Sequence, residues 1–349
     1  MITEELIQET LATVKYPGFS RDIVSFGLVK GIEVTGSDVT VKLALATRDP
    51  KIPQTINEEA SAALNALDGI GSVNLDFDIT DPPEPVTGDP SVGQSSIPGV
   101  KKIIAVASGK GGVGKSTVSV NLAVALQKSG ARVGLCDCDL YGPSVALMVG
   151  EDDKQPMATE NNEIIPIEAH GIKTISMGYL LSDDSPVIVR GPLATRYTQQ
   201  FLRQCVWGEL DYLILDLPPG TGDIQLTIVQ TVSVDGALIV TTPQEVALID
   251  ARKASSMFAK VNIPVIGLVE NMSWFECNAG VRYDIFGTGG GQKEADRLGV
   301  DMLGQIPLEP KAREGGDSGV PIATKDPAES SVSAAFQSLA ESLKEIVPA

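Results

Sequence analysis

Two stretches near the start of the chain repeat apolar side chains at the spacing of an amphipathic helix. The first covers residues 3–14, where Thr3 can cap the free amides of the first turn and two glutamates follow it. The second covers residues 56–67. We therefore predict two helices that each bury one face.

Between and after these helices, the apolar positions take on the character of strands. Residues 27–34 and 39–45 are rich in β-branched side chains and flank a short polar turn, which predicts a hairpin. Residues 72–79 alternate apolar and polar side chains, as a half-buried strand does. Together with the helices, these strands predict a small α+β domain over residues 1–80.

A stretch rich in proline, glycine and serine covers residues 81–99 and predicts a linker, because proline breaks both helices and central strands. Beyond it the pattern changes to continuous apolar runs, typical of parallel strands buried on both faces. These runs are residues 103–107, 133–136, 212–215, 236–240 and 265–269. Several are followed by helical stretches, so residues 100–349 are predicted to form an α/β domain with a doubly wound, mostly parallel sheet.

The last segment of the chain is predicted to be an amphipathic packing helix. It runs from Pro327 to Val347, and Asp326 precedes it as a capping residue. Phe336, Leu339 and Leu343 share its apolar face.

The charge balance changes which partners we expect. The 45 acidic and 27 basic residues give a net charge of -18, which repels nucleic acid, and we find no basic run. We find neither a membrane-spanning apolar segment nor the pattern of a signal peptide, so no membrane contact and a cytoplasmic location are expected. Four cysteines without dense spacing predict reduced thiols.

A glycine-rich string follows the strand predicted at 103–107 and opens a helix predicted at 116–127. It matches the G-x-x-x-x-G-K-[ST] phosphate loop in the strand–loop–helix setting that this motif requires. Glycines let backbone N–H groups surround phosphate oxygens, and the helix start adds a positive dipole end. The alternative is a glycine-rich turn without a ligand. The predicted nucleotide-binding residues are Gly109, Lys110, Gly111, Gly112, Val113, Gly114, Lys115, Ser116 and Thr117.

The motif assigns chemistry to individual side chains. Lys115 is predicted to reach the β- and γ-phosphates of ATP, and the Ser116 hydroxyl to coordinate Mg²⁺. Asp216 ends an apolar strand and is the candidate Walker B carboxylate for the same ion. Asp137 and Asp139 end another apolar strand, two residues apart, so both are expected near the Mg²⁺ and the attacking water. The alternative for Asp139 is a carboxylate that caps the following turn.

Lys110 places a second lysine inside the loop, so that it reads GKGGVGKST. This form resembles the deviant Walker A signature of the MinD and ParA class of ATPases. The resemblance implies a homodimer that sandwiches ATP, in which Lys110 contacts the nucleotide of the partner subunit. The alternative is a solvated loop lysine.

Three further strings narrow the resemblance. DLYGPS from Asp139, DLPPGTGD from Asp216 and ENMS from Glu270, with a later FG and GGG, are similar to the Mrp/ApbC family of iron–sulfur cluster carriers. Residues 22–29 resemble the small iron–sulfur assembly domain often fused ahead of such ATPases. The family implies that Asn271 and the Pro307 region contact adenine and that Asp139 senses the γ-phosphate.

One departure from the family concerns the cargo. Most such carriers have a Cys-x-x-Cys pair after the Asn-Met-Ser string, and two pairs in a dimer hold a [4Fe–4S] cluster. This chain has Cys277 but Gly280 in the second position, so a symmetric dimer offers two thiolates there. Residues 47–50 also lack a cysteine that relatives often carry.

The other thiols and the single histidine are predicted to be structural. Cys136 and Cys138 lie on the strand face opposite Asp137 and Asp139, which favours burial, and the alternative for this pair is a metal role. Cys205 is expected in the core, and His170 in a turn without a metal role.

Three functions remain open from the sequence. The first is a slow ATPase that works as a dimeric carrier, binding iron–sulfur clusters and passing them to apoproteins. The second is a regulatory ATPase of the MinD and ParA kind without metal. The third is an adaptor that recruits apoproteins and assembly proteins while another protein holds the cluster.

Overall fold

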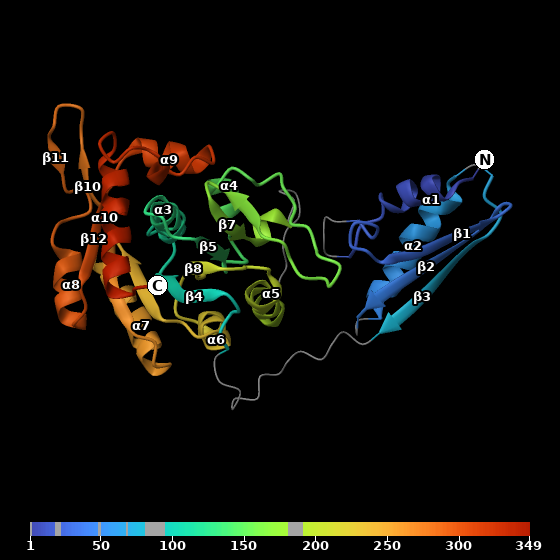
Figure 1. The fold of residues 1–349 in the computed structure, drawn as a ribbon, viewed down its shortest axis with the longest axis horizontal. Helices are drawn as coiled ribbons and strands as arrows, with labels where there is room; N and C mark the ends of the chain where they lie inside the picture. The colour runs from blue at the N-terminus through green and yellow to red at the C-terminus, as the bar shows by residue number, and fades with distance from the viewer. Residues whose placement is uncertain (1, 18–21, 48–49, 68, 81–94, 181–190) are drawn as a thin grey trace. The chain divides into compact units, whose positions relative to one another are not determined.

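The computed structural model describes residues 2–17, 22–47, 50–67, 69–80, 95–180 and 191–349. The chain divides into two compact units, and each is described by itself. The first unit contains the elements up to β3, and the second contains those from β4 onward (Figure 1).

The first unit is a three-stranded sheet with two helices. The strand order is β1-β2-β3, with β1 antiparallel and β3 parallel to β2. Thr3 accepts a hydrogen bond from the Leu6 N–H at 3.2 Å, which confirms it as the cap of the first helix. The elements are α1 (Glu4–Leu11), β1 (Val29–Thr35), β2 (Asp38–Ala46), α2 (Lys51–Asn65) and β3 (Val73–Thr80).

A core between the helices and one face of the sheet holds this unit together. Strand β2 buries alternate side chains, from Val39 to Leu45, against Ile7 and Leu11 of α1 and Leu64 of α2. This confirms the predicted α+β arrangement. Helix α2 begins at Lys51 rather than at 56, because Pro53 fits the first turn of a helix, where no N–H partner is needed.

The second unit is built on one mostly parallel sheet. Its strand order is β11-β10-β9-β4-β8-β5-β7-β6, and β12 also pairs with β10. The pairings of β10, β9, β4, β8, β5 and β7 along this path are parallel. The strands are β4 (Val100–Ala107), β5 (Val133–Asp137), β6 (Ile167–Ala169), β7 (Ile172–Ile175), β8 (Leu210–Asp216), β9 (Gly236–Thr241), β10 (Val265–Glu276), β11 (Arg282–Tyr283) and β12 (Met302–Leu308).

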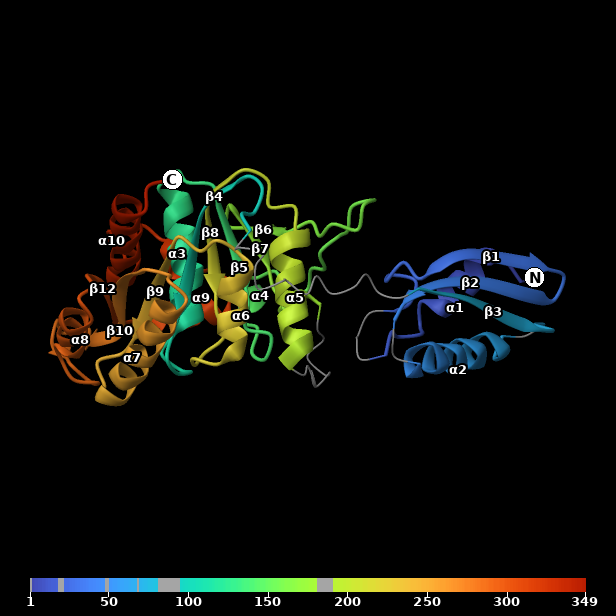
Figure 2. The same ribbon diagram turned by 90° about the horizontal axis from the view of Figure 1, so that it is seen from below.

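Helices cover both faces of this sheet, as predicted for a doubly wound fold. Helices α3, α4 and α10 lie on one face, and α5, α6 and α7 lie on the other (Figures 1 and 2). No helix within the described residues has both the length and the apolarity needed to span a bilayer. The helices are α3 (Lys115–Lys128), α4 (Val145–Met148), α5 (Gly191–Gln204), α6 (Asp223–Thr231), α7 (Glu245–Lys260), α8 (Gly290–Leu298), α9 (Pro310–Asp317) and α10 (Ser331–Ile346).

The central strands are buried on both faces, and their carboxyl ends meet at one edge. Strands β4, β5 and β8 end with buried residues, so the loops after them start from rigid positions. Ligands of open α/β sheets bind at this edge. The fold therefore brings the ends of these strands together for one site.

The C-terminal helix begins later than the sequence predicted. Helix α10 starts at Ser331, and its cap is Ser330, whose hydroxyl accepts a hydrogen bond from the Ser333 N–H at 3.1 Å. Asp326 instead accepts from the Ala328 N–H in the preceding turn, so the predicted start at Pro327 was wrong. Pro327 and a serine both suit a helix start, and the sequence pattern did not separate them.

The predicted linker falls mostly outside the described residues. Residues 81–94 are not described, whereas Ser95 forms a parallel bridge with Val232, and Ile97 is buried. The last residues of the predicted linker therefore pack on the second unit. The domain boundaries at 80 and 100 stay a prediction.

Phe336 tests how strongly α10 is docked. Its fully buried side chain packs in the main core with β12 and α3, so Phe336→Ala should lower the free energy of unfolding by about 3–5 kcal/mol. Urea unfolding followed by tryptophan fluorescence reports this unit, because both tryptophans, Trp207 and Trp274, belong to it. The exposed neighbour Gln337→Ala is the matched control, and equal transitions for both variants would contradict the prediction.

Candidate nucleotide-binding site

The glycine-rich loop connects β4 to α3 at the carboxyl edge of the sheet. Gly112 and Gly114 have φ of +82° and +81°, a left-handed conformation that glycine adopts without strain. Helix α3 then begins at Lys115, directly after Gly114. The strand–loop–helix context predicted from the sequence is therefore present.

Two glycines of the loop lie too close to other segments to carry a side chain. A Cβ on Gly109 would lie 2.0 Å from the backbone oxygen of Asp250 in α7. A Cβ on Gly114 would lie 2.2 Å from Nδ2 of Asn271 in β10. Gly111 and Gly112 face open space instead. The loop is thus clamped at Gly109 and Gly114 and open between them, where phosphate groups would enter.

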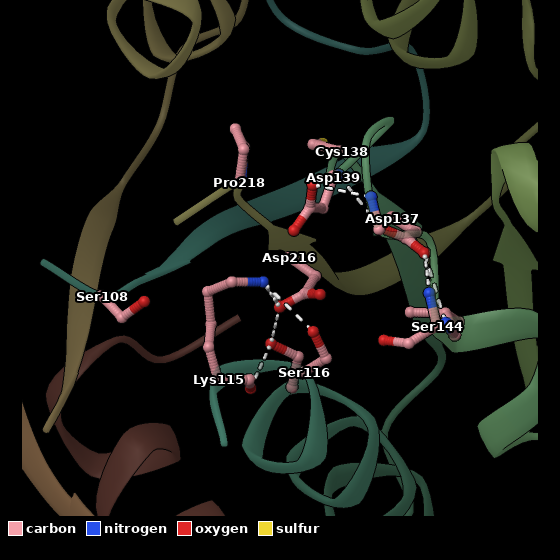
Figure 3. Close-up of polar contacts among 12 residues, drawn as sticks. Ser108, Lys115, Ser116, Asp137, Cys138, Asp139, Ser144, Asp216 and Pro218 are labelled. Atoms are coloured by element: carbon pink, nitrogen blue, oxygen red, sulfur yellow. Dashed lines mark hydrogen bonds and ion pairs between the residues drawn. The ribbon is translucent and has the colours of Figure 1, made fainter. Parts of the chain in front are cut away.

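A buried ion pair lies below the loop. Lys115 Nζ is 2.7 Å from Asp216 Oδ1, and the two side chains are 6% and 0% exposed. The Lys115 ammonium also donates to Ser116 Oγ at 3.2 Å, and Ser119 Oγ donates to Asp216 Oδ1 at 2.6 Å. Figure 3 shows the lysine extended from the start of α3 toward the end of β8. The sequence-predicted residues Lys115, Ser116 and Asp216 are thus brought together.

One oxygen of this cluster has no partner among the described residues. Asp216 Oδ2 is buried and accepts no hydrogen bond, which is costly for a carboxylate oxygen. A hard cation that prefers oxygen ligands satisfies such an atom. The donor set of Ser116 Oγ and Asp216 Oδ2 therefore fits Mg²⁺ held through water and phosphate oxygens.

Asp137 is fully buried at the end of β5, and donors surround its carboxylate. Its Oδ2 accepts hydrogen bonds from Ser176 Oγ at 2.8 Å and from the backbone N–H groups of Ser144 and Val145, both at 3.2 Å. Its Oδ1 accepts from the Asp139 N–H at 3.0 Å. Burial and the nearby Asp216 carboxylate raise the pKa of Asp137. These contacts brace the loop after β5 against the start of α4.

Asp139 lies two residues after Asp137, in the loop that follows β5. Burial raises the pKa of this carboxyl, and the positive charge of Lys115 opposes the shift. Its Oδ1 accepts a hydrogen bond from the Gly142 N–H at 3.3 Å, so the turn-capping contact weighed from the sequence is present. Asp137, Asp139 and Asp216 nevertheless gather at one edge, as Figure 3 shows. Asp139 therefore caps the turn and also lies beside the nucleotide site.

Asn271 joins the strand β10 to the phosphate loop. Its Nδ2 donates to the Val113 backbone oxygen at 2.9 Å, and the side chain is buried. The residue is therefore beside the nucleotide site, although this contact is made to the loop itself. Its adenine contact stays a prediction.

Lys110 lies in the phosphate loop between Gly109 and Gly111. Its side chain is half-buried, and within the described part of the chain no carboxylate forms an ion pair with it. Its backbone oxygen accepts a hydrogen bond from Ser108 Oγ at 2.9 Å, which holds the loop rather than the ammonium. The ammonium group is available for an anionic partner.

Sequence reasoning missed three residues that shape the site. Ser119 lies one turn into α3, and Ser176 follows β7, so neither belongs to a phosphate-loop motif. Asp250 contributes backbone rather than side chain, since its carbonyl group abuts Gly109. Only the spacing of Ser119, four residues after Lys115 on the same helix face, carries a signal in the sequence.

Cys277 lies in the tight turn between β10 and β11. The Gly280 N–H donates to the Cys277 backbone oxygen at 2.8 Å, and Gly280 has a φ of +73°. The thiol is half-buried. Over the described residues of this single chain, no three His, Cys, Asp or Glu side chains come together in a way that could hold a metal ion.

The remaining thiols and the histidine are placed as predicted. Cys136, Cys138 and Cys205 are buried, and burial raises the pKa of Cys136 well above its ordinary value. His170 lies in a turn with φ of +49°, and its Nε2 is 2.9 Å from the Gly319 backbone oxygen. Its ring therefore contacts backbone in a structural setting.

Comparison with known protein families identifies the family of this chain. The family model described as NUBPL iron-transfer P-loop NTPase matches residues 99–344. The chain belongs to this family. A second model, described as iron-sulfur cluster assembly protein, matches residues 4–76. The iron-transfer P-loop NTPase family is one of nucleotide-hydrolysing proteins, and the chain is an ATPase of this kind with a small domain ahead of it.

Relatives named as iron–sulfur cluster carriers match this chain over nearly its whole length. An iron-sulfur cluster carrier protein of Deinococcus radiodurans is 44% identical over 340 residues, which cover 97% of this chain and 94% of that protein. One of Escherichia coli is 41% identical and covers 96% of this chain and 90% of its own length. The likeness therefore includes both units.

Two solved structures share the fold of the second unit. A nucleotide-binding protein from Archaeoglobus fulgidus, in complex with ADP, is 38% identical with a TM-score of 0.57 and covers 63% of this chain and 87% of its own. The cell division ATPase MinD of Pyrococcus furiosus is 25% identical with a TM-score of 0.55, over 70% of this chain and 99% of its own. The predicted MinD-like fold is confirmed.

The close approach of Asp250 to Gly109 predicts that alanine destabilises the loop at Gly109 but not at Gly111. Gly109→Ala forces the loop away from Asp250, so we expect it to lower both the thermal stability of the second unit and the affinity for ADP. Gly111→Ala meets nothing within 4 Å and should leave the melting temperature unchanged. Melting curves of the two variants, recorded without nucleotide, test this, and equal curves would show that the clamp has no energetic weight.

Proposed function

We propose that this chain is an ATP-hydrolysing iron–sulfur cluster carrier that works as a nucleotide-switched homodimer. The observation that carries the proposal is the buried Lys115–Asp216 pair beneath an open phosphate loop, in a member of an iron-transfer family. Curated relatives with the same two units are named iron-sulfur cluster carrier proteins. The cargo is a substrate that the protein receives and passes on.

In this proposal the loop from Gly109 to Thr117 binds the phosphates of ATP through its backbone N–H groups. Lys115 leaves Asp216 and reaches the β- and γ-phosphates, since an ammonium between phosphate oxygens stabilises the charge that develops during transfer. Asn271, already beside the loop, contacts adenine from the end of β10. Hydrolysis is slow, because this class completes its site only with a partner.

Ser116 Oγ and Asp216, whose Oδ2 has no hydrogen-bond partner in the described chain, would hold Mg²⁺. When bound, the ion neutralises phosphate charge and orients the triphosphate. Asp137 was also predicted as a ligand, and the four donors around its carboxylate favour a bracing role. Asp139, with its raised pKa, orients the attacking water and senses the γ-phosphate through its loop.

The homodimer rests on two features beside the loop. Lys110 carries an ammonium group without an ion pair in the described residues, and across a dimer it would contact the nucleotide of the partner subunit. Helix α7, which touches Gly109, exposes Val246 and Ile249 at 64% and 42%. Exposed apolar side chains next to a charged loop are what a face that closes over nucleotide requires.

The cargo site of the proposal is the turn that contains Cys277. In a symmetric dimer, two copies supply two thiolates, fewer than the four that a [4Fe–4S] cluster usually has. The remaining ligands would come from outside the turn. A cluster held this way is released easily, which suits a carrier more than a store.

The small domain over residues 1–80 would recruit apoprotein clients and iron–sulfur assembly proteins. Its match to an assembly-protein model supports this role. Residues 81–99 would tether it to the ATPase domain over residues 100–349.

A second candidate function is an adaptor or a MinD-like switch that holds no cluster. Gly280 favours this function, because it stands where most such carriers have their second cysteine.

Removing the loop lysine tests the nucleotide site. Lys115→Ala should abolish ATP binding measured by calorimetry, a loss of at least about a hundredfold, because the main charge-assisted contact to the phosphates disappears. Lys260→Ala, an exposed lysine at the end of α7, is the control. Lys115→Ala leaves Asp216 buried without its cation, so circular dichroism is needed to show that the variant is folded. A folded Lys115→Ala variant with unchanged ATP affinity would refute the assignment of the phosphate loop.

Two substitutions in the turn at Cys277 should change the amount of bound iron and sulfide in opposite directions. After anaerobic reconstitution, Cys277→Ser should lower the iron and sulfide bound per chain, and Gly280→Cys should raise it by restoring a pair of thiolates. Gly280→Ser imposes the same strain at a positive φ without adding sulfur, and is the matched control. A colourless unmodified protein that still binds ATP would favour the adaptor and end the carrier proposal.

A further inference from the structure

Two buried thiols flank Asp137 at the end of β5. Cys136 and Cys138 are 0% and 1% exposed, and their sulfur atoms are 3.8 Å apart. That distance is a van der Waals contact, whereas sulfurs in a disulfide are about 2.05 Å apart. Nothing in the nucleotide site described above uses either thiol, yet both adjoin it.

The backbone of the second thiol is tied to the site itself. The Cys138 N–H donates to the Asp216 backbone oxygen at 2.9 Å, which joins the end of β5 to the end of β8. The next residue, Asp139, donates its N–H to Asp137 Oδ1 at 3.0 Å. Any movement of Cys138 therefore reaches the three carboxylates at this edge of the sheet.

We propose that Cys136 and Cys138 form a site of reversible oxidation by small peroxides, and that their disulfide disables the nucleotide site. Sulfurs already in contact need no rearrangement of distant segments to join. The inference concerns the nucleotide site of the proposed function and is independent of whether Cys277 holds a cluster.

The oxidation balances with hydrogen peroxide as the oxidant. One thiol loses its proton once it is exposed to water, and the thiolate attacks the O–O bond and becomes a sulfenic acid; the proton and the departing hydroxide leave as one water. The second thiol attacks that sulfur, the S–S bond forms, the S–O bond breaks, and a second water leaves. The two sulfurs lose two electrons in total, and the peroxide gains them. A dithiol reductant such as dithiothreitol reverses the change.

A disulfide of ordinary geometry draws the two cysteines closer than an extended strand holds them. Residues two apart in an extended strand have Cα atoms about 6.6 Å apart, whereas the usual disulfide spacing is about 5.5–6 Å. Forming the bond at its usual spacing therefore shortens the chain around Asp137, which lies between the two cysteines. This shortening pulls Cys138 away from its bond to Asp216 and turns Asp137 out of its ring of donors.

Burial limits the reaction to times when the loop after β5 opens. This loop carries Tyr141, which is 55% exposed. Bound Mg²⁺ and ATP would hold the loop through Asp139 and slow the oxidation. Protection by nucleotide distinguishes a site coupled to the ATPase from a thiol that is merely buried.

The test treats full-length protein with hydrogen peroxide and follows two readouts. All samples carry Cys277→Ser, so that the more exposed thiol does not join chains. Alkylation and peptide mapping should find a Cys136–Cys138 disulfide, formed more slowly with Mg²⁺ and ATP present. ATP hydrolysis should fall by roughly a hundredfold, the scale expected when catalytic groups shift by about 1 Å, and return with dithiothreitol.

Two variants make the test specific. Cys138→Ala and, in case it folds poorly, Cys136→Ala should hydrolyse ATP equally before and after peroxide. The proposal is overturned if the two thiols stay reduced, if Cys136 joins Cys205 instead, or if the disulfide forms and hydrolysis is unchanged. It is also overturned if the alanine variants are inactivated as fast as the parent. If the protein hydrolyses no ATP before peroxide is added, that result counts against the proposed function. Peptide mapping would still show whether the Cys136–Cys138 disulfide forms.

Discussion

The buried ion pair between Lys115 and Asp216 is the interaction on which the nucleotide site depends. Removing both charges from water is costly, and their mutual attraction offsets that cost only when further hydrogen bonds satisfy them. Ser116 and Ser119 supply two of these bonds, and Asp216 Oδ2 is left without one in the described chain. The pair is thus well placed to exchange partners: phosphates would bind the ammonium, and the carboxylate would bind Mg²⁺.

Segments far apart in the sequence share this site through short contacts. Asp250 of α7 abuts Gly109, Asn271 of β10 holds the Val113 carbonyl, and Asp137 braces the loop after β5. Strand β10 then continues to Glu276, directly before Cys277. One strand therefore connects the residue beside the phosphate loop to the turn proposed to hold the cargo. The strand is irregular between these two places, where Met272 has a φ of +55°.

The sequence predicted the parts of the structure that depend on local pattern. Buried apolar runs located β4, β5, β8, β9 and the first half of β10. The phosphate-loop motif placed Lys115 and Ser116 at one edge of the sheet, and the carboxylate at the end of an apolar run placed Asp216 there. Contacts between distant segments could not be predicted. Ser176 reaches Asp137 only because β7 pairs beside β5, and Asp250 reaches Gly109 through backbone atoms, which carry no residue signature. The start of α10 was misplaced because several residues there suit a helix start.

In the proposed mechanism, the phosphate loop captures ATP by drawing Lys115 away from Asp216, whose carboxylate would then be free for Mg²⁺. Equilibrium dialysis of labelled ATP against the unmodified full-length chain, with Mg²⁺ and with a chelator, decides whether this exchange occurs. We expect one nucleotide bound per chain, with clearly weaker binding once the ion is removed. No retained ATP in either condition would refute the mechanism.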